Sequence, residues 1–302
     1  PSGFLPEEDQ GAFFVALQLP DGASVNRTAA VATRVEGIMK AMPQVQDTLS
    51  IIGYSLLDGG AQPNAAFMIA RLKPFADRQG AANSAQAMIR QIFGMAATQI
   101  RSATVFPFNL PPIIGLSTSG GFEYQLENLE GADPATMGSV MGGLVVAANQ
   151  DPRLARVFST FSARNPSIYL DIDRDKAQAL GLGMSDVFTA LQGTLGGIYV
   201  NDFNLYGRTW QVNIQGEAAD RSDTSALWKI YIRNHDGQEV PLRAIADARI
   251  VLGPQTINRY NNYRSITVNG SPAPGISSGT ALAAMEAVSK ETLPPGYAFE
   301  WT

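Results

Sequence analysis

Residues 12–43, AFFVALQLPDGASVNRTAAVATRVEGIMKAMP, contain the pattern that decides the fold. The apolar run at 12–19 predicts a buried strand, and Pro20-Asp21-Gly22 predicts a turn directly after it. Ser24 can then cap a helix, because the apolar residues that follow recur at spacings of four, three and four: Val31, Val35, Ile38 and Met42. The stretch therefore predicts a strand, a tight turn and a helix.

The residues that follow complete a recognisable order of elements. They predict strands at 45–53 and 65–72, a helix at 83–98 and a strand at 102–106. With the first strand and helix, the order is β-α-β-β-α-β, which is that of a split βαβ or ferredoxin-like unit. Between the second and third strands, the stretch from Tyr54 to Asn64 is rich in glycine and proline and predicts a long loop.

The pattern occurs a second time further along the chain. Residues 121–129 predict a strand, and Gly131-Ala132-Asp133-Pro134 predicts a helix start with Asp133 as the N-cap. Gly22-Ala23 and Gly131-Ala132 occupy the same place in the two units. The sequence therefore indicates an internal repeat of one supersecondary unit.

An insert interrupts the second unit. Strands are predicted at 154–160 and 167–173, after which the chain predicts helices that begin at Asp175 and Ser185 and a hairpin over 196–207. The second unit resumes with strands, a helix and a last strand at Tyr297 to Trp301. We therefore expect an α+β fold of two ferredoxin-like split βαβ units, the second carrying an inserted α+β subdomain: 1–115, 116–173 with 254–302, and the insert at 174–253.

Composition narrows the function classes. The chain has 302 residues, a net charge of −5 and no run of Lys or Arg, so a groove that follows nucleic-acid phosphates is not expected. It has no Cys, which excludes disulfides, thiolate metal sites and Cys nucleophiles. No stretch reaches the ~18 apolar residues of a membrane span. The start at Pro1 and the end on a strand suggest a segment of a longer protein.

Catalytic chemistry has little support in the residues. The single histidine, His235, lies in a predicted turn, and no second histidine can complete a metal site or a proton relay. Asp171, Asp173 and Asp175 alternate, but the Gly and Glu of a calcium loop do not accompany them. We therefore predict no catalytic residue, no metal and no cofactor.

The aromatic residues give a stronger signal. Phe106 and Phe108 alternate with prolines in a segment that cannot be a central strand, and Tyr54, Leu56 and Leu57 lie in the predicted glycine-flanked loop. Such residues can line a cleft, or they can pack one domain onto the other. Spacing alone leaves both alternatives open.

The motifs as a set resemble a known family. Phe4-Leu5-Pro6-Glu7-Glu8-Asp9-Gln10-Gly11 is similar to the FLPxEDQG signature of resistance-nodulation-division (RND) multidrug efflux pumps. Similar motifs follow in order over nearly the whole chain: FPFNLP at 106–111, DIDRDKAQALG at 171–181, GGIYVNDF at 196–203, RYN at 259–261, APG at 273–275 and SSG at 277–279. The chain resembles the second large periplasmic loop of the hydrophobe/amphiphile efflux class.

This resemblance implies an architecture and partners. Residues 1–115 would be one porter subdomain, 116–173 with 254–302 a second, and 174–253 a docking subdomain facing an outer-membrane channel. The parent pump would be a proton-driven homotrimer of the bacterial inner membrane, working with a periplasmic adaptor (membrane fusion) protein. The carboxylates that relay protons would lie in the membrane part, so this periplasmic portion would touch the membrane only through segments outside it.

The resemblance also implies substrate sites. A glycine-rich switch loop would comprise Gly53, Tyr54, Ser55, Leu56, Leu57, Asp58, Gly59 and Gly60. An outer-pocket wall would comprise Phe106, Phe108 and Leu110, and inner-pocket positions would be Leu49, Ile51, Tyr54, Leu56 and Ile69. Phe158 and Thr160 stand where many relatives have Arg and Asn, which argues against anionic or strongly polar drugs.

These features suit loose binding of amphiphilic drugs, dyes or detergents. Apolar and aromatic surface attracts without direction, by about 25 cal/mol per Å² removed from water. Few fixed polar groups mean few unpaired groups when a new shape binds, hence low discrimination. The alternative is a purely structural docking or trimerisation module that binds no ligand by itself. An α+β enzyme and a metal-efflux relative are disfavoured, because the required clusters of titratable or metal-ligating residues are missing.

Overall fold

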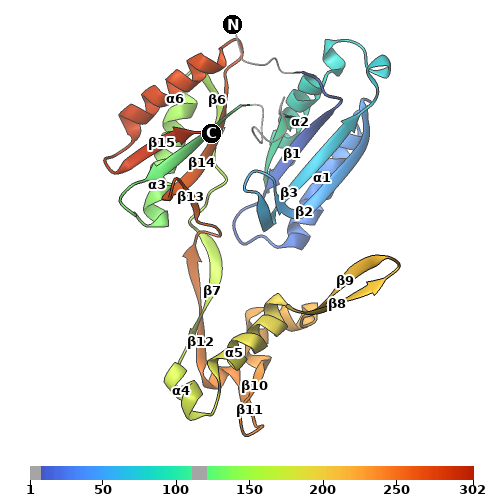
Figure 1. The fold of residues 1–302 in the computed structure, drawn as a ribbon. Helices are drawn as coiled ribbons and strands as arrows, with labels where there is room; N and C mark the ends of the chain where they lie inside the picture. Colours follow the sequence, from blue (N-terminus) through green and yellow to red (C-terminus); the bar gives the residue numbers. More distant parts are fainter. Residues whose placement is uncertain (1–7, 111–120) are drawn as a thin grey trace. The chain divides into compact units, whose positions relative to one another are not determined.

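The computed structural model describes residues 8–110 and 121–302, so Phe4, Leu5 and Pro6 of the first motif and Pro111 lie outside the described residues. The chain forms two compact units, Pro1–Pro166 with Leu252–Thr302, and Ser167–Val251. Figure 1 shows helices and strands in both, which confirms a mixed α and β composition. No helix of the described ranges is both long enough and apolar enough to cross a bilayer.

The first half of the larger unit follows the predicted order of elements. Its elements are β1 (Ala12–Gln18), α1 (Val25–Lys40), β2 (Val45–Ser55), β3 (Gly60–Leu72), α2 (Ala85–Gln99) and β4 (Thr104–Asn109). The strands form one antiparallel sheet in the order β2-β3-β1-β4. Since β4 pairs only with β1 in this sheet, its Pro107 sits on an edge strand, where a missing N–H is tolerated.

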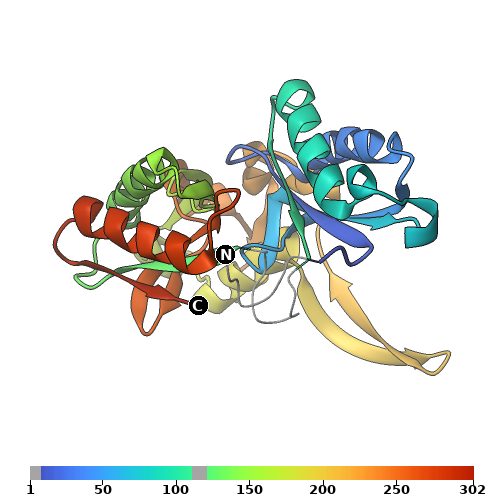
Figure 2. The ribbon, with the colours of Figure 1, turned by 90° about the horizontal axis from the view of Figure 1, so that it is seen from above.

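Local signals explain the helix starts of this half. Ser24 precedes α1 and its Oγ accepts the amide N–H of Arg27, as the sequence predicts, and Ser84 does the same for Ala87 at the start of α2. Both helices cover one side of the sheet, as the blue and teal segments of Figure 2 show. The core between these helices and the sheet contains side chains that are fully buried or nearly so: Phe13, Val15, Leu17, Val35, Met39, Met68 and Ile92.

The second half repeats this arrangement. It contains β5 (Phe122–Asn128), α3 (Pro134–Gln150), β6 (Leu154–Phe158), β13 (Asn258–Tyr260), β14 (Tyr263–Pro272), α6 (Ser278–Thr292) and β15 (Tyr297–Trp301). The sheet order is β13-β14-β5-β15, and β6 also pairs with β14. Asp133 accepts the amide N–H groups of Ala135 and Thr136, which confirms the predicted N-cap of α3.

The smaller unit contains the inserted elements. They are β7 (Asn165–Ile172), α4 (Arg174–Ala179), α5 (Met184–Leu191), a π-helical turn at Gln192–Gly196, β8 (Ile198–Leu205), β9 (Arg208–Ile214), β10 (Tyr231–Arg233), β11 (Glu239–Pro241) and β12 (Ala246–Gly253). Their core is formed by buried apolar residues that include Val187, Leu242 and Ile245. Strands β8 and β9 pair with each other alone among the described strands and form the predicted hairpin.

Several local predictions are wrong. The stretch Tyr54 to Asn64 is not a long loop, because β2 and β3 continue into it and leave a turn of only four residues, 56–59. Helix α4 begins one residue earlier than expected, since Asp173 is its cap, and α5 follows Gly183 without a side-chain cap from Ser185. Strand β7 pairs with β12 and not with the five-stranded sheet of the second half.

Candidate functional site: an aromatic sheet face beside a polar pocket

The first sheet has one face that its helices do not cover. Strand register aligns Leu49, Ile69, Phe14 and Phe108 in one row across the four strands, and Ile51, Phe67, Ala16 and Phe106 in the next. These positions alternate with the residues of the helix-facing core. We call Leu49, Ile51, Ile69, Phe14, Phe67, Phe106 and Phe108 the aromatic face.

The phenylalanines of this face contact one another. The ring centroids of Phe14 and Phe67 lie 4.9 Å apart, and those of Phe14 and Phe108 lie 5.8 Å apart, both edge to face. Phe106 stacks at 4.2 Å on Phe158 of the second half. Leu49 and Ile51, which remain 57% and 41% exposed, extend the face as open apolar surface. The result is a connected aromatic surface with an accessible aliphatic margin.

The structure thus brings together five of the residues that the resemblance implies, Leu49, Ile51, Ile69, Phe106 and Phe108. Leu110, directly after β4, is half-buried, as are Tyr54 and Leu56 near the tip of the β2–β3 hairpin. Phe14 and Phe67 also belong to this face, although they are not among the residues predicted from the sequence. The signal for Phe14 was present, because Phe13 and Phe14 are adjacent in a strand and must point to opposite faces.

The predicted switch loop is a short, hydrogen-bonded turn. Gly53 to Ser55 end β2, and Gly60 begins β3. The carboxylate of Asp58 accepts hydrogen bonds from Ser55 Oγ at 2.7 Å and from Gln62 Nε2 at 3.0 Å. Its second oxygen accepts Thr160 Oγ1 at 2.5 Å, which ties the hairpin tip to the segment that follows β6.

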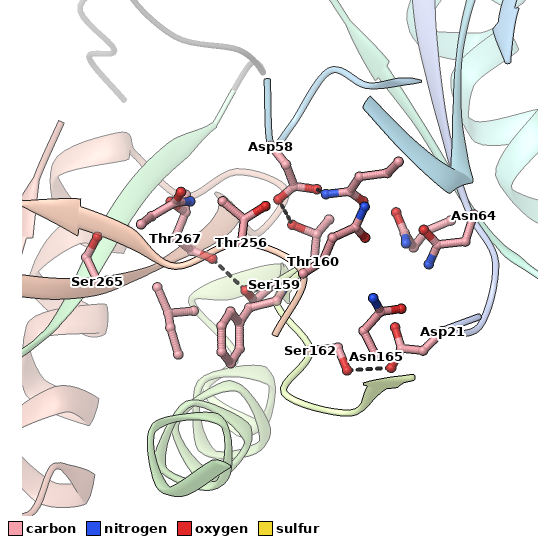
Figure 3. Close-up of a pocket in the computed structure, with 16 residues that line it drawn as sticks. Asp21, Asp58, Asn64, Ser159, Thr160, Ser162, Asn165, Thr256, Ser265 and Thr267 are labelled. Carbon is pink, nitrogen blue, oxygen red and sulfur yellow. Dashed lines mark hydrogen bonds between the residues drawn. The ribbon is translucent and has the colours of Figure 1, made fainter. Parts of the chain in front are cut away.

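A small polar pocket lies beside this hairpin tip (Figure 3). Its volume is about 50 Å³, and Asp21, Asp58, Asn64 and Thr160 are among the residues that line it. Ser162 donates a hydrogen bond to Asp21. Drug-sized ligands need about 300–1,000 Å³, so this pocket can hold a head group or a few waters and not a whole drug. Phe106 and Phe108 do not line it.

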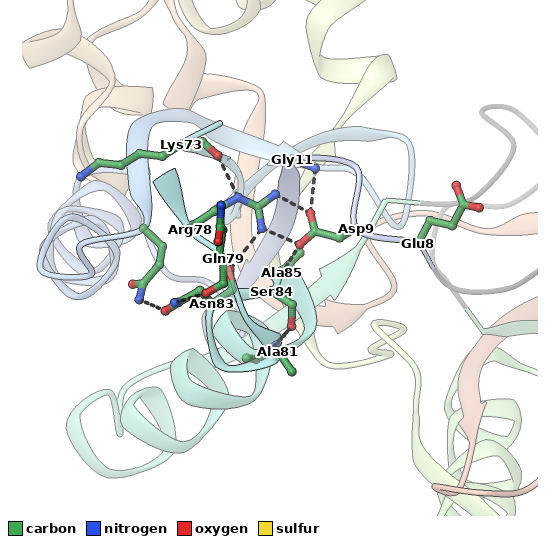
Figure 4. A network of polar contacts seen from close by, with 12 residues as sticks. Glu8, Asp9, Gly11, Lys73, Arg78, Gln79, Ala81, Asn83, Ser84 and Ala85 are labelled. Atoms are coloured by element: carbon green, nitrogen blue, oxygen red, sulfur yellow. Dashed lines mark hydrogen bonds and ion pairs between the residues drawn. The ribbon is translucent and has the colours of Figure 1, made fainter. Parts of the chain in front are cut away.

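A second polar cluster fixes the start of β1 (Figure 4). Arg78 donates two hydrogen bonds to the Asp9 carboxylate, at 2.6 and 2.8 Å, and the amide groups of Gly11 and Ala85 donate to the same carboxylate. Burial opposes the ionisation of Asp9, but these donors outweigh it and hold the pKa of Asp9 below its ordinary value. All groups in the cluster are satisfied, so it is a structural clamp.

A metal-binding cluster is not found in the part of the chain that the structure describes. Over 8–110 and 121–302, no group of three or more His, Cys, Asp or Glu could hold a metal ion. The ring of His235 lies at an exposed turn, where its Nδ1 is 2.7 Å from the carbonyl oxygen of Gly181. The aromatic face and the polar pocket both belong to the larger of the two compact units.

Comparison with known proteins identifies the family. The sequence profile of the AcrB/AcrD/AcrF family matches residues 1–302, and the chain therefore belongs to this family of RND multidrug efflux transporters. It is 36% identical over 305 residues to the multidrug export protein AcrF of Escherichia coli K12, and 34% identical over 304 residues to the toluene efflux pump membrane transporter TtgB of Pseudomonas putida.

A third relative extends the comparison. The multidrug resistance protein MdtF of E. coli K12 is 32% identical over 306 residues. All three alignments cover the whole of this chain but only 28–29% of the relatives, so the chain spans less than a third of their length.

Proposed function

We propose that this chain is the periplasmic substrate-binding and docking portion of a proton-driven multidrug efflux transporter of the bacterial inner membrane. In this proposal amphiphilic drugs, dyes or detergents bind on the aromatic face and pass toward an outer-membrane channel. The two βαβ halves, which we interpret as ferredoxin-like, act as porter subdomains at 1–115 and at 116–173 with 254–302. The insert at 174–253 acts as the docking subdomain.

The single observation that carries the proposal is the aromatic face. Seven apolar side chains from four strands converge on a sheet face that the helices leave open. Phe67 is buried, but Leu49 and Ile51 at the margin of the face remain exposed, and exposed apolar surface next to packed aromatic rings can mark an interaction site. Aromatic contact with a ligand ring contributes roughly 0.5–1.5 kcal/mol for each pair, which suits weak binding of many different molecules.

Fluorescence titration of the purified chain with N-phenyl-1-naphthylamine, an uncharged lipophilic dye, tests this proposal. Phe106→Ala and Phe108→Ala should each weaken binding by about 2- to 12-fold, which corresponds to one lost aromatic pair. Phe93→Ala is the matched control, because Phe93 is 44% exposed on α2, away from the aromatic face. If the dye does not bind, or if all three variants bind it equally well, the aromatic face is not a drug site.

A second candidate function, a structural docking and trimerisation module, is favoured by the β8–β9 hairpin. Apart from half-buried Ile198, every residue of both strands is exposed, and the apolar side chains include Phe203, Trp210 and Ile214, with Tyr206 at the tip 90% exposed. A two-stranded hairpin has too few partners to be stable alone. We infer that it reaches a neighbouring subunit of a homotrimer, and that the insert meets the channel and the adaptor.

The docking role has its own test. Light scattering of the chain at increasing concentration should show self-association. The double variant Trp210→Ser with Tyr206→Ser should weaken it, with a dissociation constant at least tenfold higher. Tyr231→Ser with Tyr169→Ser is the control pair, because both residues are exposed in the same unit but outside the hairpin. Association that is unaffected by the hairpin substitutions, or equally affected by the control pair, would contradict this role.

A further inference from the structure

The face of the second sheet that lies opposite its apolar core has a different chemistry from the aromatic face of the first sheet. Along β5, Phe122, Tyr124 and Leu126 enter the core, whereas Glu123, Gln125 and Glu127 point to the other face. Strand register adds neighbours from β14 and β15 to that face: Ser265, Thr267, Asn269 and Glu300. This face is therefore polar and acidic, and we call it the acidic face.

Two hydrogen-bond acceptors on the acidic face lack donors among the described residues. Glu127 is only 3% exposed, yet its Oε1 accepts no hydrogen bond from the described residues, and the same holds for Oδ1 of Asn269. Among the described residues, no Lys or Arg forms an ion pair with Glu123, Glu127 or Glu300. Burial, with a smaller effect of Glu300, raises the pKa of Glu127, as expected for a carboxyl without a cation beside it.

The polar pocket continues this chemistry. Ser265 and Thr267 of the acidic face also line the pocket, together with Asp21, Asp58 and Asn64. Asn64 is 3% exposed, and although its Nδ2 donates to the Leu19 carbonyl, its Oδ1 is another acceptor without a described donor (Figure 3). The residues that line the pocket include no Lys and no Arg. The unmet atom that lines the pocket, Asn64 Oδ1, is an acceptor, so the group that it lacks is a donor.

The aromatic face and the pocket are linked through one short segment. Phe158 stacks on Phe106 of the aromatic face, and two residues later Thr160 lines the pocket and binds Asp58. A volume of about 50 Å³ admits a primary ammonium group with a few waters, since a cavity needs roughly 10–15 Å³ to hold one water. The apolar part of such a ligand would stay outside the pocket, where the aromatic face is available.

We propose that this site selects cationic amphiphiles with a small protonated amine, which binds in the pocket at Asp21 and Asp58 while the apolar part lies on the aromatic face. This inference rests on the proposed drug-binding function and adds the substrate class. A protonated amine brings up to three N–H donors and a positive charge to a site that has acceptors and carboxylates. An anionic head group would meet two carboxylates and no cation.

Displacement of N-phenyl-1-naphthylamine by amphiphiles of one chain length tests the selection. Below their micelle concentrations, dodecylamine should displace the dye at about tenfold lower concentration than dodecanol, and dodecanoate should be weaker than dodecanol. Dodecyltrimethylammonium, which has the charge but no N–H donor and a larger head, should lose most of the advantage. The preference for dodecylamine should fall as salt is added, since screening weakens it.

Variants separate the head-group site from the apolar site. The preference for dodecylamine should fall in Asp21→Asn and in Asp58→Asn and should be lost in the double variant, and all three variants should still bind the dye. The control is the double variant Asp220→Asn with Asp236→Asn, which changes the net charge by the same amount in the other unit. This control should keep the preference for dodecylamine. Asp21→Asn alone suffices if Asp58→Asn disturbs the hairpin. The inference is overturned if dodecylamine and dodecanoate displace the dye equally well, or if the double variant at Asp21 and Asp58 keeps the preference. In either case the proposed drug-binding function still stands as long as the dye binds. If the dye does not bind, both fail.

Discussion

Substitution of Asp9 by Asn should destabilise the first βαβ half by about 3–5 kcal/mol. The side chain of Arg78 is 2% exposed, so its charge depends on the Asp9 carboxylate for compensation. Removing one partner of a buried ion pair leaves an uncompensated charge and costs roughly this amount. Asn has one acceptor oxygen instead of two, so it also cannot serve Arg78 and the amide groups of Gly11 and Ala85 at once.

Urea unfolding followed by circular dichroism measures this effect, with hydrogen exchange at the Ala85 amide as a local probe. Asp47→Asn is the matched control, because the Asp47–Arg71 pair lies in the same sheet but both side chains are more than half exposed. Exposed pairs contribute only about 0.2–1 kcal/mol. If Asp9→Asn costs no more than Asp47→Asn at pH 7, the clamp has no role in stability.

The pH dependence of stability gives an independent test of the Asp9→Asn prediction. The pKa of Asp9 in the folded protein is held below its value of about 3.9 in an unfolded chain. Its contribution to stability is therefore fully present above about pH 5 and is lost as the pH falls through the lowered folded pKa. The difference between wild type and Asp9→Asn should shrink toward pH 3, and a difference that grows on acidification would refute the reasoning.

Three further changes have expected outcomes. Gly22→Ala should cost more than about 1 kcal/mol in urea unfolding, because Gly22 has φ +75° and an added Cβ would lie 2.7 Å from Pro166 Cγ. Thr160→Val should speed hydrogen exchange in the turn at 56–59 several-fold without unfolding the sheet, because it removes the hydrogen bond to Asp58. Glu127→Gln should stabilise the protein by about 1 kcal/mol at pH 7 and by nothing at pH 4. The pKa of Glu127 is raised in the folded protein, so this carboxyl destabilises the fold only at a pH at which it is ionised in the unfolded chain.

Each of these changes has an outcome that contradicts it. Gly80→Ala is the control for Gly22→Ala, because Gly80 also has positive φ but an added Cβ would meet no atom within 4 Å. Equal losses at both positions would mean that Pro166 gives way. Unchanged exchange in Thr160→Val would show that the turn is held by Ser55 and Gln62 alone. A Glu127→Gln variant less stable than wild type at pH 7 would show that the carboxylate has a favourable partner.

The starts of α1 and α3 and the order of elements in the first half could be predicted because their signals are local. Ser24 and Asp133 each precede a run with helical spacing, and each is found as the N-cap. The β2–β3 hairpin could not be predicted in the same way. Glycine and proline in this stretch predict a loop because both have a weak preference for strands. Pro63, however, lies in a part of β3 that is outside the paired registers. The pairing of β3 with both β1 and β2 outweighs the weak strand preference of these residues.

The aromatic face was only partly predictable for a related reason. Phe106 and Phe108 were identified through the resemblance, whereas Phe14 and Phe67 join them only through long-range register: Phe14 pairs with Phe108 and with Ile69. A shift of one residue in that register would move every side chain of the strand to the other face. The sequence shows which residues alternate along each strand. It does not show which residues lie beside one another across the sheet, because neighbouring strands are up to about ninety positions apart in the chain.

The repeated topology explains why the two sheet faces that lie opposite the helices could diverge. In each half, the side of the sheet that meets the helices must stay apolar, because the halves fold around those contacts. The opposite sides are free of that requirement, and one carries phenylalanine where the other carries glutamate and glutamine. An amphiphile has an apolar part and a polar part, and the proposed binding mode places the first on the aromatic face and the second in the pocket that Ser265 and Thr267 of the acidic face help to line. The selection of a charged head group therefore requires no change in the fold, only different residues at alternate positions of the strands.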